Sequence, residues 1–185
     1  MKTLKILDIG CGRNKISGAV GIDIDRHSLA DIFHDLNRYP YPLKEASFDQ
    51  IYAKHIIEHL DDPRAFLREI ARILKPGGAA FVETPHFSSR VAYSEPEHKL
   101  FYSYFMFDSL LSGIPELCFV ERKITFYKTF RAIGIQCLAN RYPDAYERFW
   151  TYWFPAENIK VLLQKKGTED GRDGFQGVGR PSRAG

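Results

Sequence analysis

The 185-residue sequence has few cysteines, no long apolar run and no dense run of charge of one sign. Cys11, Cys118 and Cys137 are widely spaced without a C-x-x-C pair, which excludes a disulfide framework and a zinc knuckle. No apolar run reaches the roughly 18 residues that a membrane span needs, and no signal peptide precedes the first apolar segment. Net charge is only +3, which does not favour nucleic acid as a partner. These absences predict a cytoplasmic protein with reduced thiols.

Short apolar runs that alternate with turn signals predict an α/β fold. Apolar residues make up 44% of the chain and charged residues 26%, as in ordinary globular domains. We expect strands over residues 5–9, 19–22, 30–36, 48–53, 79–83, 119–128 and 156–165. The links after the first two strands are too short for crossover helices, so loops or single turns are expected there. One hypothesis is that a second subunit of a homodimer covers the sheet face left without helices.

Two helices and three regions complete the predicted organisation. Asp62 and Pro63 form a helix start, and apolar residues at spacings of three and four continue it to about Lys75. A second helix is predicted over 104–112. Residues 1–166 are expected to form one domain, with an aromatic insert over 129–155 that either packs, self-associates or lines a substrate site. The glycine-rich tail, 167–185, is expected to be disordered.

A nucleoside site is predicted where the first two strands end. Gly10 and Gly12 follow the first strand and would let a ligand approach the backbone closely. Asp23 ends the second strand and could accept both hydroxyls of a ribose, with Asp25 as the alternative. The dinucleotide pattern G-x-G-x-x-G would need a glycine where Lys15 stands, which counts against NAD or FAD.

Five motifs in order resemble the class I S-adenosylmethionine-dependent methyltransferases, in particular the small-molecule group called type 11. They are Asp8-Ile9-Gly10-Cys11-Gly12, Val20-Gly21-Ile22-Asp23-Ile24-Asp25, Ser47-Phe48-Asp49-Gln50-Ile51, Glu58-His59-Leu60 and Ile73-Leu74-Lys75-Pro76-Gly77-Gly78. The resemblance implies a Rossmann-like sheet that is mostly parallel, with an antiparallel last strand and shortened helices after strands one and two. It also implies S-adenosylmethionine as the cofactor.

The resemblance implies which residues contact this cofactor. They are Asp8, Gly10, Cys11, Gly12, Asn14, Asp23, Ile24, Asp35, Leu36, Lys54 and His55. In this interpretation Gly10 and Gly12 face the methionyl part, and Asp35 and Leu36 bracket the adenine. Asp35 could instead cap the turn before Asn37.

His86 and His98 are the candidate catalytic bases, because they follow the fifth strand and titrate near neutral pH. Each could also have a purely structural role. The run His55-Ile56-Ile57-Glu58-His59 matches the H-x-x-E-H zinc motif, but it lacks the long helix that this motif requires. We therefore expect no metal site, and we expect His59 to hold the loop.

The resemblance implies methyl transfer to a small-molecule acceptor by in-line displacement. Two alternatives stay open: a nucleotide-dependent oxidoreductase, and a non-catalytic methyltransferase-like fold that acts as a cofactor-binding or partner subunit. Fold-level resemblance does not specify the acceptor.

Overall fold

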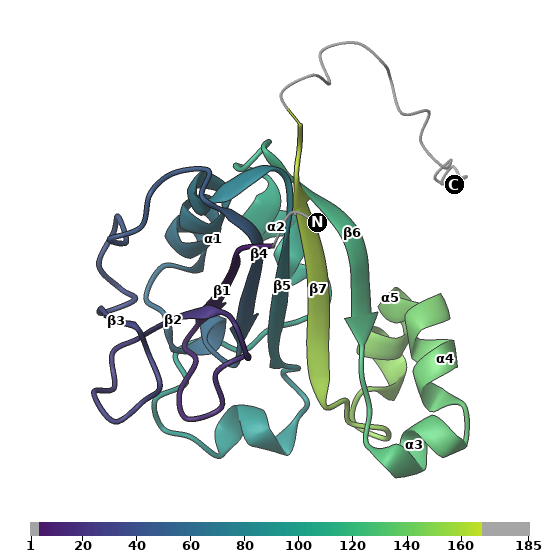
Figure 1. The fold of residues 1–185 in the computed structure, drawn as a ribbon. Coiled ribbons are helices and arrows are strands. Elements are labelled where there is room, and N and C mark those ends of the chain that lie inside the picture. Colours follow the sequence, from purple (N-terminus) through teal and green to yellow (C-terminus); the bar gives the residue numbers. More distant parts are fainter. Residues whose placement is uncertain (1–3, 168–185) are drawn as a thin grey trace.

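A seven-stranded sheet in the order β3-β2-β1-β4-β5-β7-β6 runs through the computed structural model, which describes residues 4–167 (Figure 1). The strands are β1 (Ile6–Ile9), β2 (Val20–Asp23), β3 (Ile32–Phe33), β4 (Phe48–Lys54), β5 (Leu74–Pro85), β6 (Leu117–Ile124) and β7 (Asn158–Lys165). Strands β1 to β5 pair in parallel, and β7 is antiparallel to both β5 and β6. The predicted fold class is confirmed.

Strands β3, β5 and β6 differ most from the expected ranges, whereas the bounds of the other four agree to within two residues. Strand β5 begins at Leu74 rather than at residue 79, because Leu74 already pairs with Phe48 and the chain continues through an irregularity at Gly77 (φ 78°). Strand β3 contains only two residues. Strand β6 ends at Ile124, because helix α3 (Lys128–Ala132) follows it closely.

Helix α1 (Pro63–Ile73) begins where its sequence predicts. The Asp62 side chain accepts the backbone N–H groups of Arg64 and Ala65, each at 2.9 Å, and Pro63 occupies the first turn. Its apolar face packs on one side of the sheet and contacts helix α2 (Met106–Leu111). This layer contains the main core of the domain.

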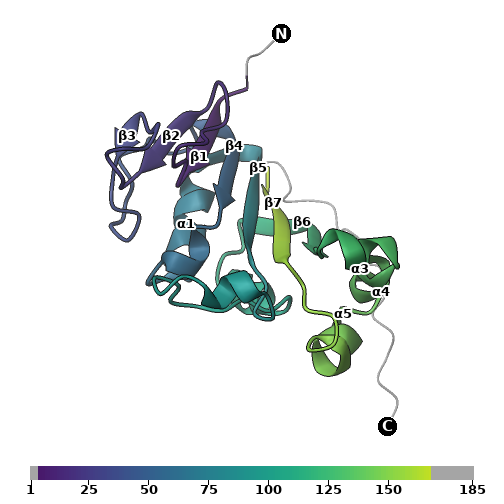
Figure 2. The same cartoon turned by 90° about the horizontal axis from the view of Figure 1, so that it is seen from below.

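The opposite face of the sheet has no such cover near β1 and β2. Residues 10–56 contain no helix, so the predicted loops after the first two strands are confirmed. A Cβ on Gly21 of β2 would lie 2.7 Å from Cys11 Sγ and 2.6 Å from Lys15 Cδ, so the loop itself packs on this strand. Figure 2 shows α1 on one side of the strands only.

The remaining elements lie after β4, after β5 and after β6. They are η1 (Ile57–His59), η2 (Arg90–Tyr93), α4 (Ile135–Arg141), α5 (Pro143–Ala145) and η3 (Tyr146–Trp150). The insert of α3, α4, α5 and η3 lies beside β6 at the end of the sheet (Figure 1). Apart from Gly167, the predicted tail lies outside the described residues. Among residues 4–167, no helix combines the length and apolar character needed to cross a bilayer.

Candidate functional site

The loop that follows β1 turns at two glycines. Gly10 has a φ of 68° and Gly12 a φ of 50°, a left-handed region that other residues rarely adopt. A Cβ on Gly10 would lie 1.9 Å from Cδ1 of Ile56, whereas a Cβ on Gly12 would meet no atom within 4 Å. Gly12 therefore presents bare backbone to open space, which a ligand can approach closely.

Asp23, at the carboxyl end of β2, contacts this loop directly. Its Oδ2 accepts the N–H of Gly12 at 2.8 Å, and its Oδ1 accepts the N–H of Asp25 at 2.8 Å. Each carboxylate oxygen has a further lone pair, so the half-buried side chain can still accept ribose hydroxyls. Asp25 instead accepts the N–H of His27 at 2.8 Å. The structure thus brings together Gly12 and Asp23, which the sequence assigned to one site.

Asp8 is the buried carboxylate of the site. It is 6% exposed, and its Oδ2 accepts the N–H of Ile16 at 2.8 Å. Burial raises the pKa of Asp8, an effect partly opposed by the N–H of Ile16 and by the nearby charge of Lys54. A cationic group bound beside Asp8 would favour the ionised carboxylate, so the site suits a ligand that carries positive charge.

The remaining cofactor candidates near β2 and β3 differ in exposure. Ile24 is 64% exposed directly after Asp23, which leaves an apolar surface beside the carboxylate. Leu36 is buried, whereas Asn14 lies exposed in the glycine loop. Asp35 accepts the N–H of Asn37 at 3.0 Å, so it caps a turn, as the alternative interpretation holds.

His55 follows β4 in a left-handed conformation, with a φ of 54°. Its N–H donates to the carbonyl of Glu83 in β5 at 2.8 Å, and its Nδ1 lies 3.4 Å from Oε1 of Glu58. Glu58 raises the pKa of His55. Lys54, the last residue of β4, is exposed, with its Nζ 6.0 Å from the centre of the Phe81 ring.

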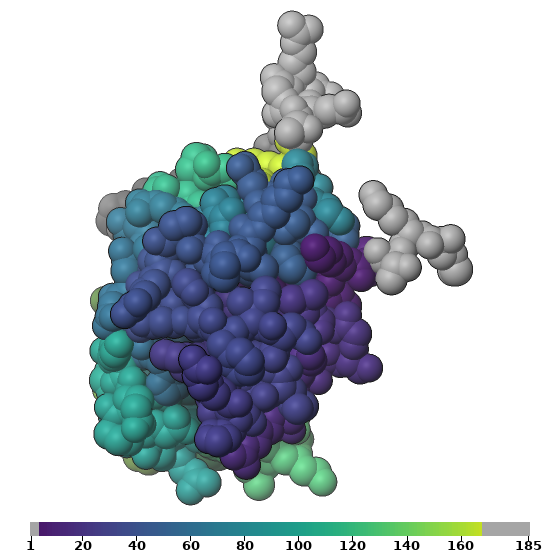
Figure 3. Space-filling view, turned by 60° about the vertical axis from the view of Figure 1, so that its left-hand side comes forward, coloured from purple at the N-terminus to yellow at the C-terminus, as the bar shows by residue number. Residues whose placement is uncertain are grey.

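Sequence reasoning did not assign Glu58 a role, although this residue is buried at the edge where β4 and β5 end. Its Oε2 accepts the hydroxyl of Thr84 at 3.0 Å. Its places in the H-x-x-E-H run and in the Glu58-His59-Leu60 motif were the signals that could have identified it. Figure 3 shows the surface on this side of the molecule, where the purple and blue segments before residue 60 border the teal segment that follows β5.

The two predicted catalytic histidines lie in different environments. His86 is fully buried: its Nε2 lies 3.0 Å from Glu147 Oε1, and its Nδ1 lies 2.8 Å from the Ser88 hydroxyl. His98 has its Nδ1 2.8 Å from the carbonyl oxygen of Ala92. Each ring is therefore bonded within the protein. Glu147 was missed because 61 residues separate it from His86.

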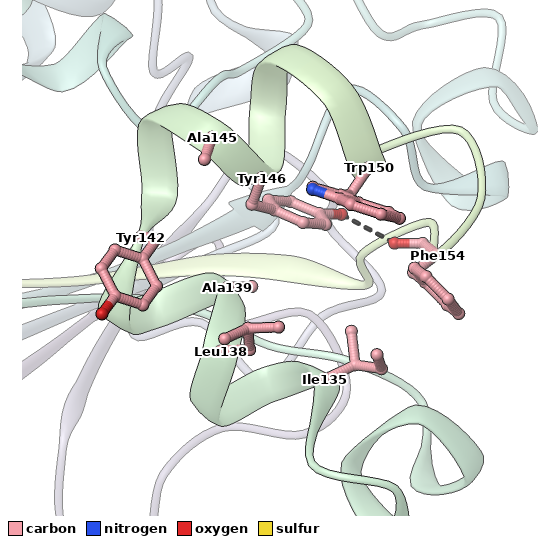
Figure 4. A pocket seen from close by; sticks show the side chains of 8 residues that line it. All are labelled: Ile135, Leu138, Ala139, Tyr142, Ala145, Tyr146, Trp150 and Phe154. Atoms are coloured by element: carbon pink, nitrogen blue, oxygen red, sulfur yellow. Dashed lines mark hydrogen bonds between the residues drawn. The ribbon is translucent and has the colours of Figure 1, made fainter.

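The insert contains an apolar cavity of about 390 Å³ between α4, α5 and η3 (Figure 4). Its walls include Leu138, Tyr146, Trp150 and Phe154, and the Tyr146 hydroxyl donates to the carbonyl of Phe154 at 2.8 Å. None of its lining residues belongs to the predicted cofactor set. Its apolar walls could hold a nonpolar group, and none of its lining residues is a histidine, a carboxylate or a lysine.

Sequence comparison supports the methyltransferase interpretation over the first half of the chain. Residues 7–82 match the family described as methyltransferase domain. An O-methyltransferase of Pyrenophora dematioidea is 33% identical over 95 residues, which cover 39% of this chain and 36% of the relative. The ubiquinone biosynthesis O-methyltransferase of Pelagibacter ubique is 31% identical over 103 residues, covering 45% and 43% respectively. The matches thus span less than half the length of these curated relatives.

Structural comparison extends over nearly the whole described chain. The crystal structure of a SAM-dependent methyltransferase from Archaeoglobus fulgidus has a TM-score of 0.63 at 19% identity, covering 88% of this chain and 86% of that one. This likeness shows the fold. Residues 7–82 therefore match the methyltransferase domain family in sequence, and the described chain shares the fold of an S-adenosylmethionine-dependent methyltransferase.

Proposed function

We propose that the chain binds S-adenosylmethionine at the glycine loop, with Asp23 holding the ribose. The observation that carries this proposal is the 2.8 Å bond from the Gly12 N–H to Asp23, beside open space at Gly12. The exposed side chain of Ile24 offers an apolar surface that a purine ring would cover. Asp8 supplies a buried carboxylate near the methionyl end, where the cofactor carries positive charge.

We infer that the reaction is methyl transfer to a small-molecule acceptor. When bound, S-adenosylmethionine would supply an activated methyl group, which passes in line to an acceptor lone pair as the carbon–sulfur bond breaks and its electron pair stays on sulfur. The residues of the chain would then have two tasks, which are to align the acceptor and to exclude water. The segment after β5 would cover the acceptor, because it follows the strand next to β4 at the cofactor edge.

A small-molecule acceptor is supported by the similarity to O-methyltransferases, including one named for ubiquinone biosynthesis. A hydroxyl acceptor must lose a proton, so a base would be needed. His86 and His98 remain the predicted bases. For either to act, the acceptor would have to replace one of its present partners.

Calorimetric titration with S-adenosylhomocysteine, the demethylated cofactor, tests the binding step. We expect Asp23→Ala to weaken binding about 10- to 100-fold, because charge-assisted hydrogen bonds to the ribose are lost. Asp25→Ala is the matched control, since it removes a neighbouring carboxylate that does not bond Gly12, and it should change affinity less than about threefold. Equal weakening by both variants would contradict the assignment. Circular dichroism of both variants checks that the loop change leaves the fold intact.

A second candidate function is a non-catalytic, cofactor-binding partner subunit. The observation that favours it is the absence of helices over residues 10–56, which leaves one sheet face without a helical layer. Turnover of labelled S-adenosylmethionine with phenolic acceptors separates the two functions. Methyl transfer that Asp23→Ala abolishes supports the enzyme, whereas tight binding without turnover on any acceptor supports the partner subunit.

A further inference from the structure

Two segments far apart in the sequence meet beside the predicted cofactor edge. The short helix η1 contributes Glu58 and His59, and the segment before α2 contributes His98. The N–H groups of Lys99 and Leu100 donate to the carbonyl of Glu58 at 2.8 and 3.3 Å, which fixes the two segments together. As a result, one potential ligand atom from each of Glu58, His59 and His98 lies within 4.8 Å of the other two.

The His98 ring is oriented as metal-binding imidazoles usually are. A carbonyl oxygen can only accept, so the 2.8 Å contact with Ala92 requires a hydrogen on Nδ1 of His98. In the neutral ring, Nε2 therefore carries a lone pair, and it faces Oε2 of Glu95 at 3.6 Å. The second ring nitrogen of a metal-bound histidine commonly has such a backbone partner.

His59 approaches the same carboxylate. Its Nε2 lies 3.9 Å from Oε2 of Glu95, and the centres of the His59 and His98 rings are 4.7 Å apart. The two ring nitrogens and this carboxylate oxygen therefore face one common space, where a cation would be attracted to all three.

Glu58 provides a second, independent observation at this cluster. It is 1% exposed, and its Oε2 is occupied by the Thr84 hydroxyl. Its Oε1 is buried and accepts no hydrogen bond within normal geometry, with Nδ1 of His55 at 3.4 Å. A buried carboxylate oxygen without a hydrogen bond is costly unless a cation or a donor satisfies it.

We propose that Glu58, His59 and His98 bind a divalent transition-metal ion of the zinc type, with Glu95 closing the site as a fourth ligand. Two imidazoles and two carboxylates suit zinc, whereas magnesium and calcium prefer oxygen ligands alone. Bonds from the ligand atoms to one ion are about 2.0–2.2 Å long. To form them, the ligand atoms would have to move about 1 Å closer to one another than they now lie. The exposed side chain of Glu95 is free to make such a movement.

The proposed ligands are not those of the H-x-x-E-H interpretation. That interpretation needed His55 and His59 on one long helix, whereas η1 has only three residues. Here the second histidine comes from the segment after β5, 39 positions further along the chain. The metal would therefore hold that segment against η1, at the edge where the acceptor is proposed to bind. This inference depends on neither cofactor binding nor methyl transfer.

Titration of tag-free, EDTA-treated protein with Zn²⁺ tests the proposal, with calorimetry as the readout. We expect one ion per chain, and at least about 100-fold weaker binding in His59→Gln and in His98→Gln, because each variant loses one ligand. Glu95→Gln should weaken binding less, by about 10-fold. His27→Gln is the matched control, because the exposed His27 lies outside the cluster, and it should bind as the wild type does.

Two further readouts separate loss of a ligand from loss of folding. Zn²⁺ should raise the melting temperature of the wild type and of His27→Gln, but not that of His59→Gln, because an ion that binds only the folded state stabilises it. When Co²⁺ replaces Zn²⁺, the wild type should show the absorption bands of a four-coordinate site. His59→Gln and His98→Gln should not show these bands. The proposal is overturned if no stoichiometric binding occurs, or if folded His59→Gln and His98→Gln bind Zn²⁺ as the wild type does.

Discussion

The two faces of the sheet are covered in different ways. On one face, Ile51, Val82 and Val161 are almost fully buried in one cluster with Phe66 of α1. On the other face, residues that alternate with these along the same strands, such as Tyr52, Phe81 and Leu162, are only half-buried. The difference shows that α1 and α2 close the core on one face of the sheet, whereas the open face is covered near β1 and β2 by the glycine loop, which also forms the candidate site.

The largest expected difference between the faces is in stability. We expect Phe66→Ala to lower the free energy of unfolding by about 3–5 kcal/mol, because it opens a cavity in the packed layer. Phe81→Ala, on the open face, should cost less than half as much. Urea unfolding of both variants measures the contrast. Equal losses, with a dependence on protein concentration, would mean that a second copy covers the open face and would support the homodimer hypothesis.

Alanine substitutions at the two loop glycines should affect stability and ligand binding differently. Gly10→Ala should lower the free energy of unfolding by about 2–4 kcal/mol, because the methyl group meets Ile56 and the left-handed conformation is strained. Gly12→Ala has only the conformational cost, about 1 kcal/mol, but its methyl group would enter the proposed ligand space. Unfolding and S-adenosylhomocysteine titration should therefore rank the two variants in opposite orders. The same order in both measurements would contradict the proposed site.

Removing a tyrosine hydroxyl from each face of the sheet compares the two faces through a smaller change in stability. The hydroxyl of Tyr102, buried in the covered layer, donates to the carbonyl of Ile57 at 3.0 Å. Tyr102→Phe should cost about 1–2 kcal/mol, because the buried carbonyl of Ile57 then keeps only the weak 3.4 Å bond from the N–H of Leu60. Tyr52→Phe, on the open face, removes only a 3.5 Å contact with Gln50 and should change stability by less than about 0.5 kcal/mol. Thermal unfolding of the pair is the measurement, and a larger loss from Tyr52→Phe would reverse the interpretation.

The smallest expected effect is the pH dependence from Asp8. Burial raises its pKa in the folded protein above the ordinary 3.8, so the protonated form is favoured on folding. That contribution is complete below about pH 4 and is lost as the pH rises through the raised pKa. Asp8→Asn does not titrate and can still accept the N–H of Ile16, so its stability relative to wild type should increase across this interval by less than about 1 kcal/mol. A difference that stays flat from pH 4 to 7 would show that burial of Asp8 is fully compensated.

The sequence predicted those features that are determined by residues close together in the chain or by the ends of adjacent strands. Asp62 and Pro63 identified the start of α1 because capping involves residues within one turn. The short links after β1 and β2 indicated loops because their length alone excludes a crossover helix. The meeting of Gly12 and Asp23 followed because adjacent parallel strands end at the same edge.

Contacts between distant segments could not be predicted in this way. The region from Thr84 to Tyr104 has no regular spacing of apolar residues, so nothing in it indicated that His98 would lie beside His59. The fully buried position of His86 likewise depends on Glu147, which comes from the insert. The sequence indicated that histidines follow β5, but their partners depend on how the chain returns to this edge.

The carboxylate of Glu147 joins the insert to the segment that follows β5. Its Oε1 accepts from both the N–H of Tyr104 at 2.5 Å and Nε2 of His86 at 3.0 Å, while the same helical segment forms one wall of the apolar cavity. A molecule that displaced η3 on entering the cavity would therefore strain these two bonds. By thermodynamic reciprocity, occupancy of the cavity would alter the affinity of the acceptor side, and an acceptor would alter the affinity of the cavity equally.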